Sequence, residues 1–322
     1  VWHDAAPFEN YQEQVPRFMS EFGFQSFPDP SVWVGALREE DLDTNAVEFR
    51  AHQKHPKGFA LISQYIDLDF PLPTNFTELT YLSQLNQARG VCMGIEAQRT
   101  SDRYCMGSLF WQLNDCWPSI SWSSIDFKGT WKALQYALKE EYNPIYLSTK
   151  QLGDSLFMYV VNDSREPIIG TLKLEIFNFD GKRLGIYGTT ATKTLKSNEM
   201  LEEWVLPEEW NNDYSMDEIY TQLTFEMPEG ERSVIQTLGS PKDLKLTPQE
   251  IQQEIIWKKD HFEVTLLANH FHVNVWLNSQ MTGKWTDNFF HLIPGETKTV
   301  SFYPEQDNSL MQLQVLSLNT FY

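Results

Sequence analysis

Two apolar runs in the first 143 residues are typical of strands in a βα architecture, in which strands and helices alternate. The first run is residues 16–26, PRFMSEFGFQS, which contains Glu21. The second is residues 104–111, YCMGSLFW, which is apolar almost throughout. A nearly continuous apolar run is what a parallel strand needs when both faces of its sheet are covered. The pattern therefore predicts two buried parallel strands.

Helical spacing follows each of these runs. A helix is predicted to begin at Asp29-Pro30-Ser31, a second to span residues 75–98, and a third to span residues 130–142. In each segment, apolar residues recur every three or four positions, as on the buried face of a helix. Pro144 ends the third helix, because the residue before a proline is pushed out of the helical region.

After Pro144 the pattern changes to short strands separated by turn residues. Asp180-Gly181 predicts a tight hairpin, and Gly239-Ser240-Pro241 predicts a linker. Such spacing is typical of β-sandwiches. The predicted strands are residues 155–161, 171–176, 202–206, 220–227 and 233–237, followed by 262–267, 273–277, 299–303 and 310–318. We therefore expect two immunoglobulin-like sandwiches, at residues 146–240 and 241–322, after a βα part at residues 1–145.

Composition narrows the classes of partner. The formal charge of −19 argues against nucleic acid or an anionic membrane as the main partner, because both carry negative charge. Aromatic residues make up 14% of the chain, which suits either large aromatic cores or the binding of sugar rings. Composition alone leaves both interpretations open.

The cysteines and the apolar runs exclude further classes. Cys92, Cys105 and Cys116 are an odd number without the paired spacing of a disulfide framework or a zinc site. No apolar run approaches the roughly 20 residues of a membrane-spanning helix. The chain opens at Val1 without a signal-like segment, so we expect any localisation signal to lie upstream.

Glu21 is the first candidate for chemistry. It lies at the end of a predicted βα strand, the place where loops build active sites in a barrel. Gly23 follows, and glycine permits a close approach of backbone to a ligand. The alternative is an ordinary exposed carboxylate at a strand end.

Trp111 begins the second candidate site. It ends the other apolar run and is followed by Gln112, Asn114 and Asp115. An indole ring beside amide and carboxylate groups suits the recognition of one sugar ring. The alternative is a core tryptophan next to an Asn-Asp turn.

Together, the two motifs resemble family 2 glycoside hydrolases of the β-mannosidase branch. The resemblance rests on Ser20-Glu21-Phe22-Gly23, on the run from Gly107 through Trp111-Gln112-Leu113-Asn114-Asp115-Cys116-Trp117-Pro118, on Ser121-Trp122-Ser123, and on Gly129-Thr130-Trp131-Lys132. The opening Val1-Trp2-His3-Asp4, with Pro7-Phe8, resembles bacterial members of that branch. The resemblance to the family is close over residues 1–145 and extends to the β-rich remainder only in the order of its domains.

The resemblance implies a fold and a set of roles. Residues 1–145 would be the C-terminal part of a (β/α)8 TIM barrel, its last two βα units. Glu21 would be the catalytic nucleophile and Trp111 the floor under the sugar. Asn114, Asp115, Trp2 and His3 would contact the substrate. No metal or redox cofactor is implied.

The partner carboxylate that the family uses as acid/base follows an asparagine on an earlier strand. The only Asn-Glu pair here, Asn198-Glu199, falls in a predicted sandwich. The expected function is thus a retaining exo-β-mannosidase acting on terminal non-reducing β-D-mannose, of which this chain is an incomplete C-terminal part. A bacterial parent would be periplasmic or secreted. The alternatives are another family 2 exo-β-glycosidase, such as a glucosaminidase or galactosidase, and a non-catalytic carbohydrate-binding or scaffold fragment.

Overall fold

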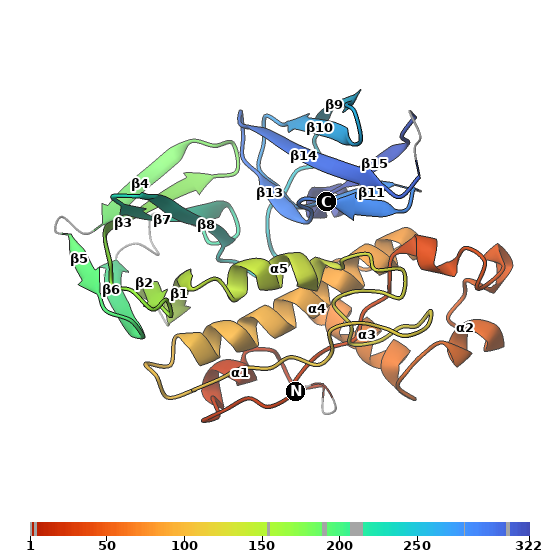
Figure 1. Ribbon diagram of the computed structural model, residues 1–322, viewed down its shortest axis with the longest axis horizontal. Helices are drawn as coiled ribbons and strands as arrows, with labels where there is room; N and C mark the ends of the chain where they lie inside the picture. The colour runs from red at the N-terminus through yellow and green to blue at the C-terminus, as the bar shows by residue number, and fades with distance from the viewer. Residues whose placement is uncertain are drawn as a thin grey trace.

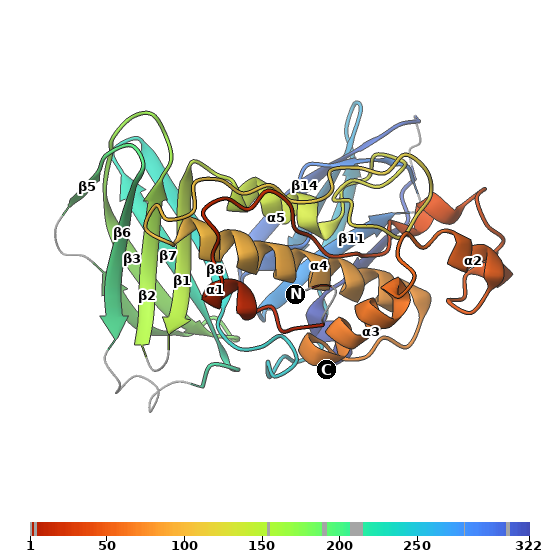
Figure 2. The ribbon, with the colours of Figure 1, turned by 90° about the horizontal axis from the view of Figure 1, so that it is seen from below.

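The computed structural model describes residues 2, 5–152, 155–188, 192–206, 215–279, 281–306 and 310–322. A helical layer carries two β-sandwiches, which lie side by side on it (Figure 1). Seen from below, the long helix α4 passes under both sandwiches (Figure 2). Among the described residues, no helix combines the length and apolar character needed to cross a membrane.

The helical layer contains all the α-helices of the described chain. They are α1 (Asn10–Glu13), α2 (Val47–Ala51), α3 (Gly58–Asp69), α4 (Phe76–Arg99) and α5 (Ala133–Glu141), with 3-10 turns η1 (Pro30–Trp33) and η2 (Glu39–Asp41). The helices predicted at 75–98 and 130–142 are confirmed as α4 and α5. Asp29 caps a single turn, η1, because the chain turns away at Gly35, whose φ is 82°. The helix α3 was not predicted.

The helix α4 owes its start to Asn75. The Oδ1 atom of Asn75 accepts a hydrogen bond from the backbone N–H of Glu78 at 3.0 Å, which satisfies one of the unpaired donors of the first turn. The Glu78 carboxylate in turn accepts hydrogen bonds from the backbone N–H and the hydroxyl of Thr74. This reciprocal cap fixes where the longest helix of the chain begins.

The first sandwich packs two antiparallel sheets around one core. Its strands are β1 (Ile145–Leu152), β2 (Ser155–Asn162), β3 (Ile168–Asn178), β4 (Arg183–Gly188), β5 (Lys193–Leu195), β6 (Glu199–Leu206), β7 (Ile219–Met227) and β8 (Gly230–Thr237). One sheet has the order β1-β2-β6 and the other β4-β3-β7-β8, with β5 paired to β3. Leu156, Leu174 and Phe225 are fully buried between the sheets. Gly181, at φ 80°, forms the predicted turn between β3 and β4.

The second sandwich follows the same plan. Its strands are β9 (Gln252–Trp257), β10 (Phe262–Leu267), β11 (His272–Ser279), β12 (Gly283–Trp285), β13 (Phe290–Leu292), β14 (Thr297–Pro304) and β15 (Leu313–Leu316), followed by the turn η4 (Leu318–Phe321). The sheets β12-β14-β10-β9 and β13-β11-β15 enclose Val264, Leu266 and Val275. The strand predicted at 262–267 has the bounds of β10. Six strands were not predicted, namely β1, β4, β5, β9, β12 and β13.

Tyr81 of α4 anchors the second sandwich to the helical layer. Its ring is fully buried and stacks on Trp276 of β11, with ring centroids 5.8 Å apart, and on Phe321 at the same distance. Its hydroxyl donates to the backbone oxygen of Asn274 at 2.7 Å. The sandwich is therefore held by an apolar contact with one polar anchor.

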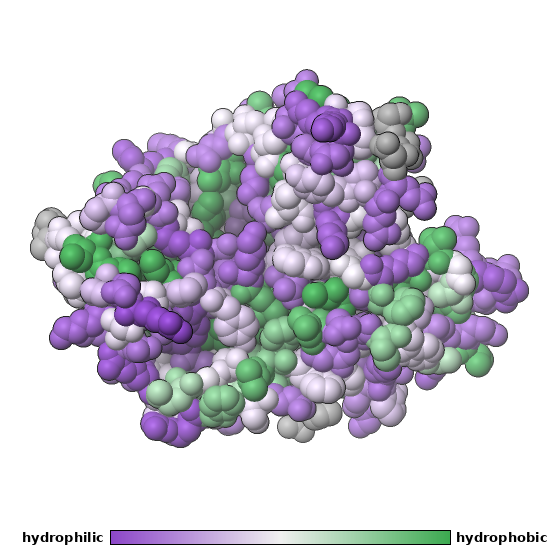
Figure 3. Space-filling view, in the orientation of Figure 1, coloured by the Kyte–Doolittle hydropathy of each residue, from purple (hydrophilic) through white to green (hydrophobic). Residues whose placement is uncertain are grey.

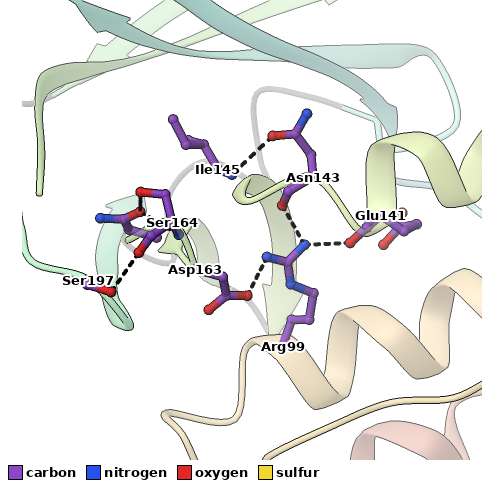
Figure 4. A network of polar contacts seen from close by, with 8 residues as sticks. Arg99, Glu141, Asn143, Ile145, Asp163, Ser164 and Ser197 are labelled. Atoms are coloured by element: carbon purple, nitrogen blue, oxygen red, sulfur yellow. Dashed lines mark hydrogen bonds and ion pairs between the residues drawn. The ribbon is translucent and has the colours of Figure 1, made fainter. Parts of the chain in front are cut away.

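Arg99, at the end of α4, seats the first sandwich (Figure 4). Its guanidinium donates to the backbone oxygens of Glu141 and Asn143, at 2.5 and 2.9 Å, and to the Asp163 carboxylate at 2.6 Å. It also lies 4.6 Å from the centre of the Tyr146 ring. One side chain thus joins α4, the end of α5, and the turn after β2.

A cavity of about 690 Å³ lies where the helical layer meets both sandwiches. Residues of α4, α5, β8 and β13 line it. Figure 3 shows the molecule hollowed between the two sandwiches. The sandwiches therefore meet the helices separately rather than as one continuous β layer.

Candidate active site

Two extended segments, residues 16–26 and 104–111, run in parallel beside α4. An isolated parallel bridge joins Met19 to Ser108. The backbone N–H of Met19 donates to the oxygen of Gly107 at 2.9 Å, and that of Leu109 donates to the oxygen of Met19 at 2.8 Å. The sequence predicted these two segments as buried parallel strands. The structure confirms their parallel pairing, but as an isolated bridge rather than as regular strands, and Tyr104, Met106 and Leu109 are about half exposed or more rather than buried. The hydrogen-bonded stretch ends where the backbone N–H of Trp111 donates to the oxygen of Phe22, so the C-terminal ends of the paired stretches lie at one edge, as the carboxyl ends of parallel strands do.

Glu21 lies at this edge. Its side chain is exposed, and within the described residues it makes no hydrogen bond or ion pair. Phe22, the next residue, is buried and packs against α4, where a Cβ on Gly94 would lie 2.7 Å from its ring. The burial of Phe22 therefore directs Glu21 to the opposite side of the segment.

Trp111 lies beside Glu21 at the end of the neighbouring segment. The backbone N–H of Trp111 donates to the oxygen of Phe22 at 2.7 Å. Trp111 is 50% exposed, so a large part of it is open to solvent. The peptide bond from Trp111 to Gln112 is cis. A carboxylate and an open indole thus stand on adjacent segments.

Gly23 permits the close approach of the two segments. A Cβ at Gly23 would lie 2.0 Å from the backbone oxygen of Trp111, far inside contact distance. From the sequence, Gly23 was predicted to let the backbone approach a ligand closely. The structure uses it instead for the approach of one segment to the other.

Asp115 holds the loop that follows Trp111. It is 5% exposed, and its carboxylate accepts hydrogen bonds from the hydroxyls of Ser121 (2.7 Å) and Ser123 (2.6 Å). The predicted substrate contact of Asp115 is not supported by this position, because its oxygens are turned into the loop. Asn114 next to it is exposed at the same edge as Trp111.

Trp2 is placed in the core rather than at the site. It is 6% exposed and stacks on the Tyr65 ring at 6.3 Å, with Phe24 and Trp122 packed edge-on against it. The aromatic cluster that surrounds Trp2 leaves it no open face for a sugar. His3 lies outside the described residues.

Lys132, at the start of α5, is fully buried below the loop. Its ammonium donates to the Ser26 hydroxyl at 2.9 Å. Burial lowers the pKa of Lys132 to about 8, although the nearby carboxylates of Asp115 and Asp126 favour its charged form. This cation joins the base of α5 to the segment that carries Glu21.

Buried polar side chains of α4 also reach this region, and the sequence did not indicate them. Ser83 accepts a hydrogen bond from the backbone N–H of Phe27 at 3.0 Å, and Gln84 donates to the oxygen of Phe27 at 3.1 Å. Gln87 lies one turn further along the same face. Their spacing of three and four residues is that of one helical face. The sequence signal that could have revealed them is a row of polar residues at helical spacing, on a face that would otherwise be apolar.

The comparisons with known proteins agree on one class. A family model described as an Ig-fold domain, Ig_mannosidase, matches residues 246–321. The whole fold is similar to the crystal structure of β-D-mannosidase from Dictyoglomus thermophilum, with a TM-score of 0.84 and 24% identity over 98% of this chain and 39% of that one. It is also similar to an exo-chitosanase from Amycolatopsis orientalis, with a TM-score of 0.72 and 16% identity over 98% of this chain and 44% of that one.

Proteins related in sequence point to the same class. The chain is 27% identical to β-mannosidase A of Aspergillus terreus, over 94% of this chain and 37% of the relative. It is 30% identical to β-mannosidase of Capra hircus, over 92% of this chain and 36% of the relative. The chain is therefore similar to glycoside hydrolases over nearly its whole length. More particularly, it is a homologue of the β-mannosidases, as its two motifs predicted, and it spans just over a third of the length of these relatives.

Proposed function

We propose that this chain is the C-terminal part of a retaining exo-β-mannosidase and that Glu21 is its nucleophile. One observation carries the proposal. In a homologue of the β-mannosidases, an exposed carboxylate ends a segment that is hydrogen-bonded in parallel to another ending in a half-exposed tryptophan. In the proposed fold these segments are the last two strands of a (β/α)8 barrel, whose active sites lie at this end.

The reaction would be a double displacement. A Glu21 oxygen attacks the anomeric carbon of a terminal β-mannosyl residue while a second carboxyl group protonates the leaving oxygen. The resulting α-linked glycosyl-enzyme ester is then cleaved by water, which the second group deprotonates, and β-mannose is released. The two carboxyl groups of a retaining enzyme stand about 5–5.5 Å apart. The second group belongs to a part of the barrel outside this chain.

Trp111 would support the sugar during these steps. Its open indole face suits contact with the C–H groups of a pyranose, and the adjacent exposed Asn114 offers an amide to a sugar hydroxyl. Asp115 would act only by shaping the loop. The two sandwiches would serve as scaffold for the helices, a role that the anchors at Tyr81 and Arg99 support.

The test of Glu21 is a substitution in the full-length protein. Glu21→Ala should lower turnover of 4-nitrophenyl β-D-mannoside by orders of magnitude, because no covalent intermediate can form. Added azide should restore part of the activity by attacking from the vacated side, and the product should be α-mannosyl azide. Glu9→Ala, which removes an exposed carboxylate elsewhere in the helical layer, is the control. Near-normal activity of Glu21→Ala would remove Glu21 from this role.

The sugar is tested with the same protein. Rates on the β-mannoside should exceed those on the corresponding β-galactoside and β-glucosaminide. Equal or faster turnover of either alternative would assign the protein to another exo-β-glycosidase and leave the role of Glu21 intact.

A further inference from the structure

Gln87 is buried at the centre of α4 and binds both halves of the candidate site. Its side-chain amide nitrogen donates to the backbone oxygen of Phe24 at 2.8 Å, in the segment that carries Glu21. The same nitrogen lies 3.0 Å from the oxygen of Trp122, in the loop that follows Trp111. One amide thus contacts two stretches of backbone almost 100 residues apart in sequence.

The contact with Trp122 leads directly to Trp111. The Trp122 oxygen also accepts the backbone N–H of Gln112 at 3.2 Å, and Gln112 is bonded to Trp111. On the other side, Phe24 is three residues from Glu21. Gln87 therefore binds the backbone three residues from Glu21 and, through the Trp122 oxygen, is linked to the residue next to Trp111, while its own side chain reaches neither Glu21 nor Trp111.

The rest of the amide is also occupied. The Oε1 atom of Gln87 accepts a hydrogen bond from the Ser26 hydroxyl at 2.7 Å, and that hydroxyl accepts one from Lys132. The Nε2 atom also lies 3.2 Å from the oxygen of Ser123, whose hydroxyl binds Asp115. A fully bonded buried amide has a single orientation, so it can transmit position from a rigid helix to both segments.

We propose that Gln87 is a positioning residue that sets the placement of Glu21 relative to Trp111. The inference rests on the proposed function, because it assigns Gln87 a part in the reaction of Glu21. Without this amide, three backbone oxygens would lose a donor, and its direct link from α4 to both Phe24 and Trp122 would be lost. Misplacement of reacting groups by about 1 Å can cost about 100-fold in rate.

The experiment compares Gln87→Met with Gln98→Met in the full-length protein. Both replace a buried glutamine of α4 by an apolar side chain of similar length, but Gln98 lies at the far end of the helix, and its Oε1 atom has no hydrogen-bond partner among the described residues. Gln87→Met should lower kcat on 4-nitrophenyl β-D-mannoside about 10- to 100-fold with KM within threefold. Hydrogen exchange in the peptide around Trp111 should become faster. Gln98→Met should change neither.

A kcat of Gln87→Met within threefold of the wild type would overturn the proposal, as would an equal loss in Gln98→Met. If Gln87→Met does not fold, Ser26→Ala decides, since it removes one hydrogen bond of the same amide. It should lower kcat at constant KM, and an unchanged kcat would overturn the proposal. Glu21→Gln, measured alongside, tests the proposed function separately, because retained activity there would refute the nucleophile whatever Gln87 does.

Discussion

At the scale of single residues, the arrangement of the candidate site depends on Gly23 and on the Gln87 amide, which hold the backbone that carries Glu21 and Trp111. Glu21 and Trp111 are both open to solvent, and what brings them together is the backbone beneath them. Gly23 lets that backbone close up, and Gln87 fixes it from behind. Glu21 and Trp111 lie at the surface, whereas the Gln87 amide that fixes their relative position lies in the interior.

Gly23→Ala is expected to disturb the site because its methyl group would meet the Trp111 oxygen at 2.0 Å. Backbone cannot move aside as a flexible side chain can, so kcat should fall at least tenfold and the thermal midpoint should drop. Gly107→Ala is the matched control on the partner segment. There the added methyl meets the exposed ring of Phe18, which can turn away. Equal effects of the two substitutions would show that the spacing at Gly23 has no special part.

The sequence predicted the surface half of the site and missed the buried half for a physical reason. Glu21 and Trp111 each end an apolar run, so their position could be inferred locally. Gln87 acts on partners that only the folded chain brings near, and Asp115 was predicted as a substrate contact rather than as the buried acceptor for Ser121 and Ser123. A buried glutamine whose partners are backbone oxygens leaves no matching residue type in the sequence. Trp2 was misplaced because an aromatic residue near a strand end suits a sugar floor and a core equally well.

At the scale of elements, the end of α5 brings a buried carboxyl group close to one of α4. The carboxyl group of Glu141 lies near that of Glu96 on α4, and Arg99, Tyr146 and Lys150 surround the pair. Burial is the main cause that raises the pKa of both carboxyl groups, and for Glu141 the value rises to about 8. Arg99 acts in the opposite direction without reversing the shift of Glu141.

The stability of the folded chain should consequently fall as the pH rises from about 4.5 to about 8. In this window folded Glu141 keeps its proton whereas the unfolded chain has released it, so each step upward in pH favours unfolding. Above about 8 the effect should level off. The urea midpoint measured from pH 5 to 9 would show it. Glu141→Gln should flatten the slope, and the exposed Glu250→Gln should leave it unchanged. Parallel curves for Glu141→Gln and the wild type would contradict the assignment.

Elements were predicted well where the information was local. The helix α4 follows from its Asn75 cap and apolar spacing, and β10 follows from strict alternation. The helix α3 was missed because no cap residue marks its start, which has no side-chain cap in the structure. The strand β1 was missed because it directly follows Pro144, with no turn residue between the two to mark its start. Pairing of the two parallel segments required the fold.

At the scale of the whole molecule, the segments that carry the site present apolar side chains to solvent. Phe18, Tyr104, Met106, Leu109 and Leu113 are all about half exposed or more. A cluster of this kind is typical of a surface that another part of a protein covers. In the proposed enzyme, the neighbouring barrel strands would cover it and supply the acid/base carboxyl group.

The chain alone is expected to show no hydrolysis of 4-nitrophenyl β-D-mannoside. Its only Asn-Glu pair, Asn198-Glu199, lies at the start of β6 in the first sandwich, away from the segments that carry Glu21. Glu199→Gln should likewise leave the activity of the full-length protein unchanged. Turnover by the purified chain, abolished by Glu21→Ala, would show that it holds a complete site after all.

The contacts of Arg99 bear on how such proteins can exchange parts during evolution. Its guanidinium belongs to α4 of the helical layer, and its partners belong to the end of α5, to the connection after it and to the turn after β2 of the first sandwich. A hybrid that joined the helices of one relative to the sandwich of another would inherit the cation and the Asp163 carboxylate from different ancestors. Recombination at Pro144 should therefore give a stable hybrid mainly between parents that share both Arg99 and Asp163. The ion pair thus restricts which relatives can exchange their sandwiches.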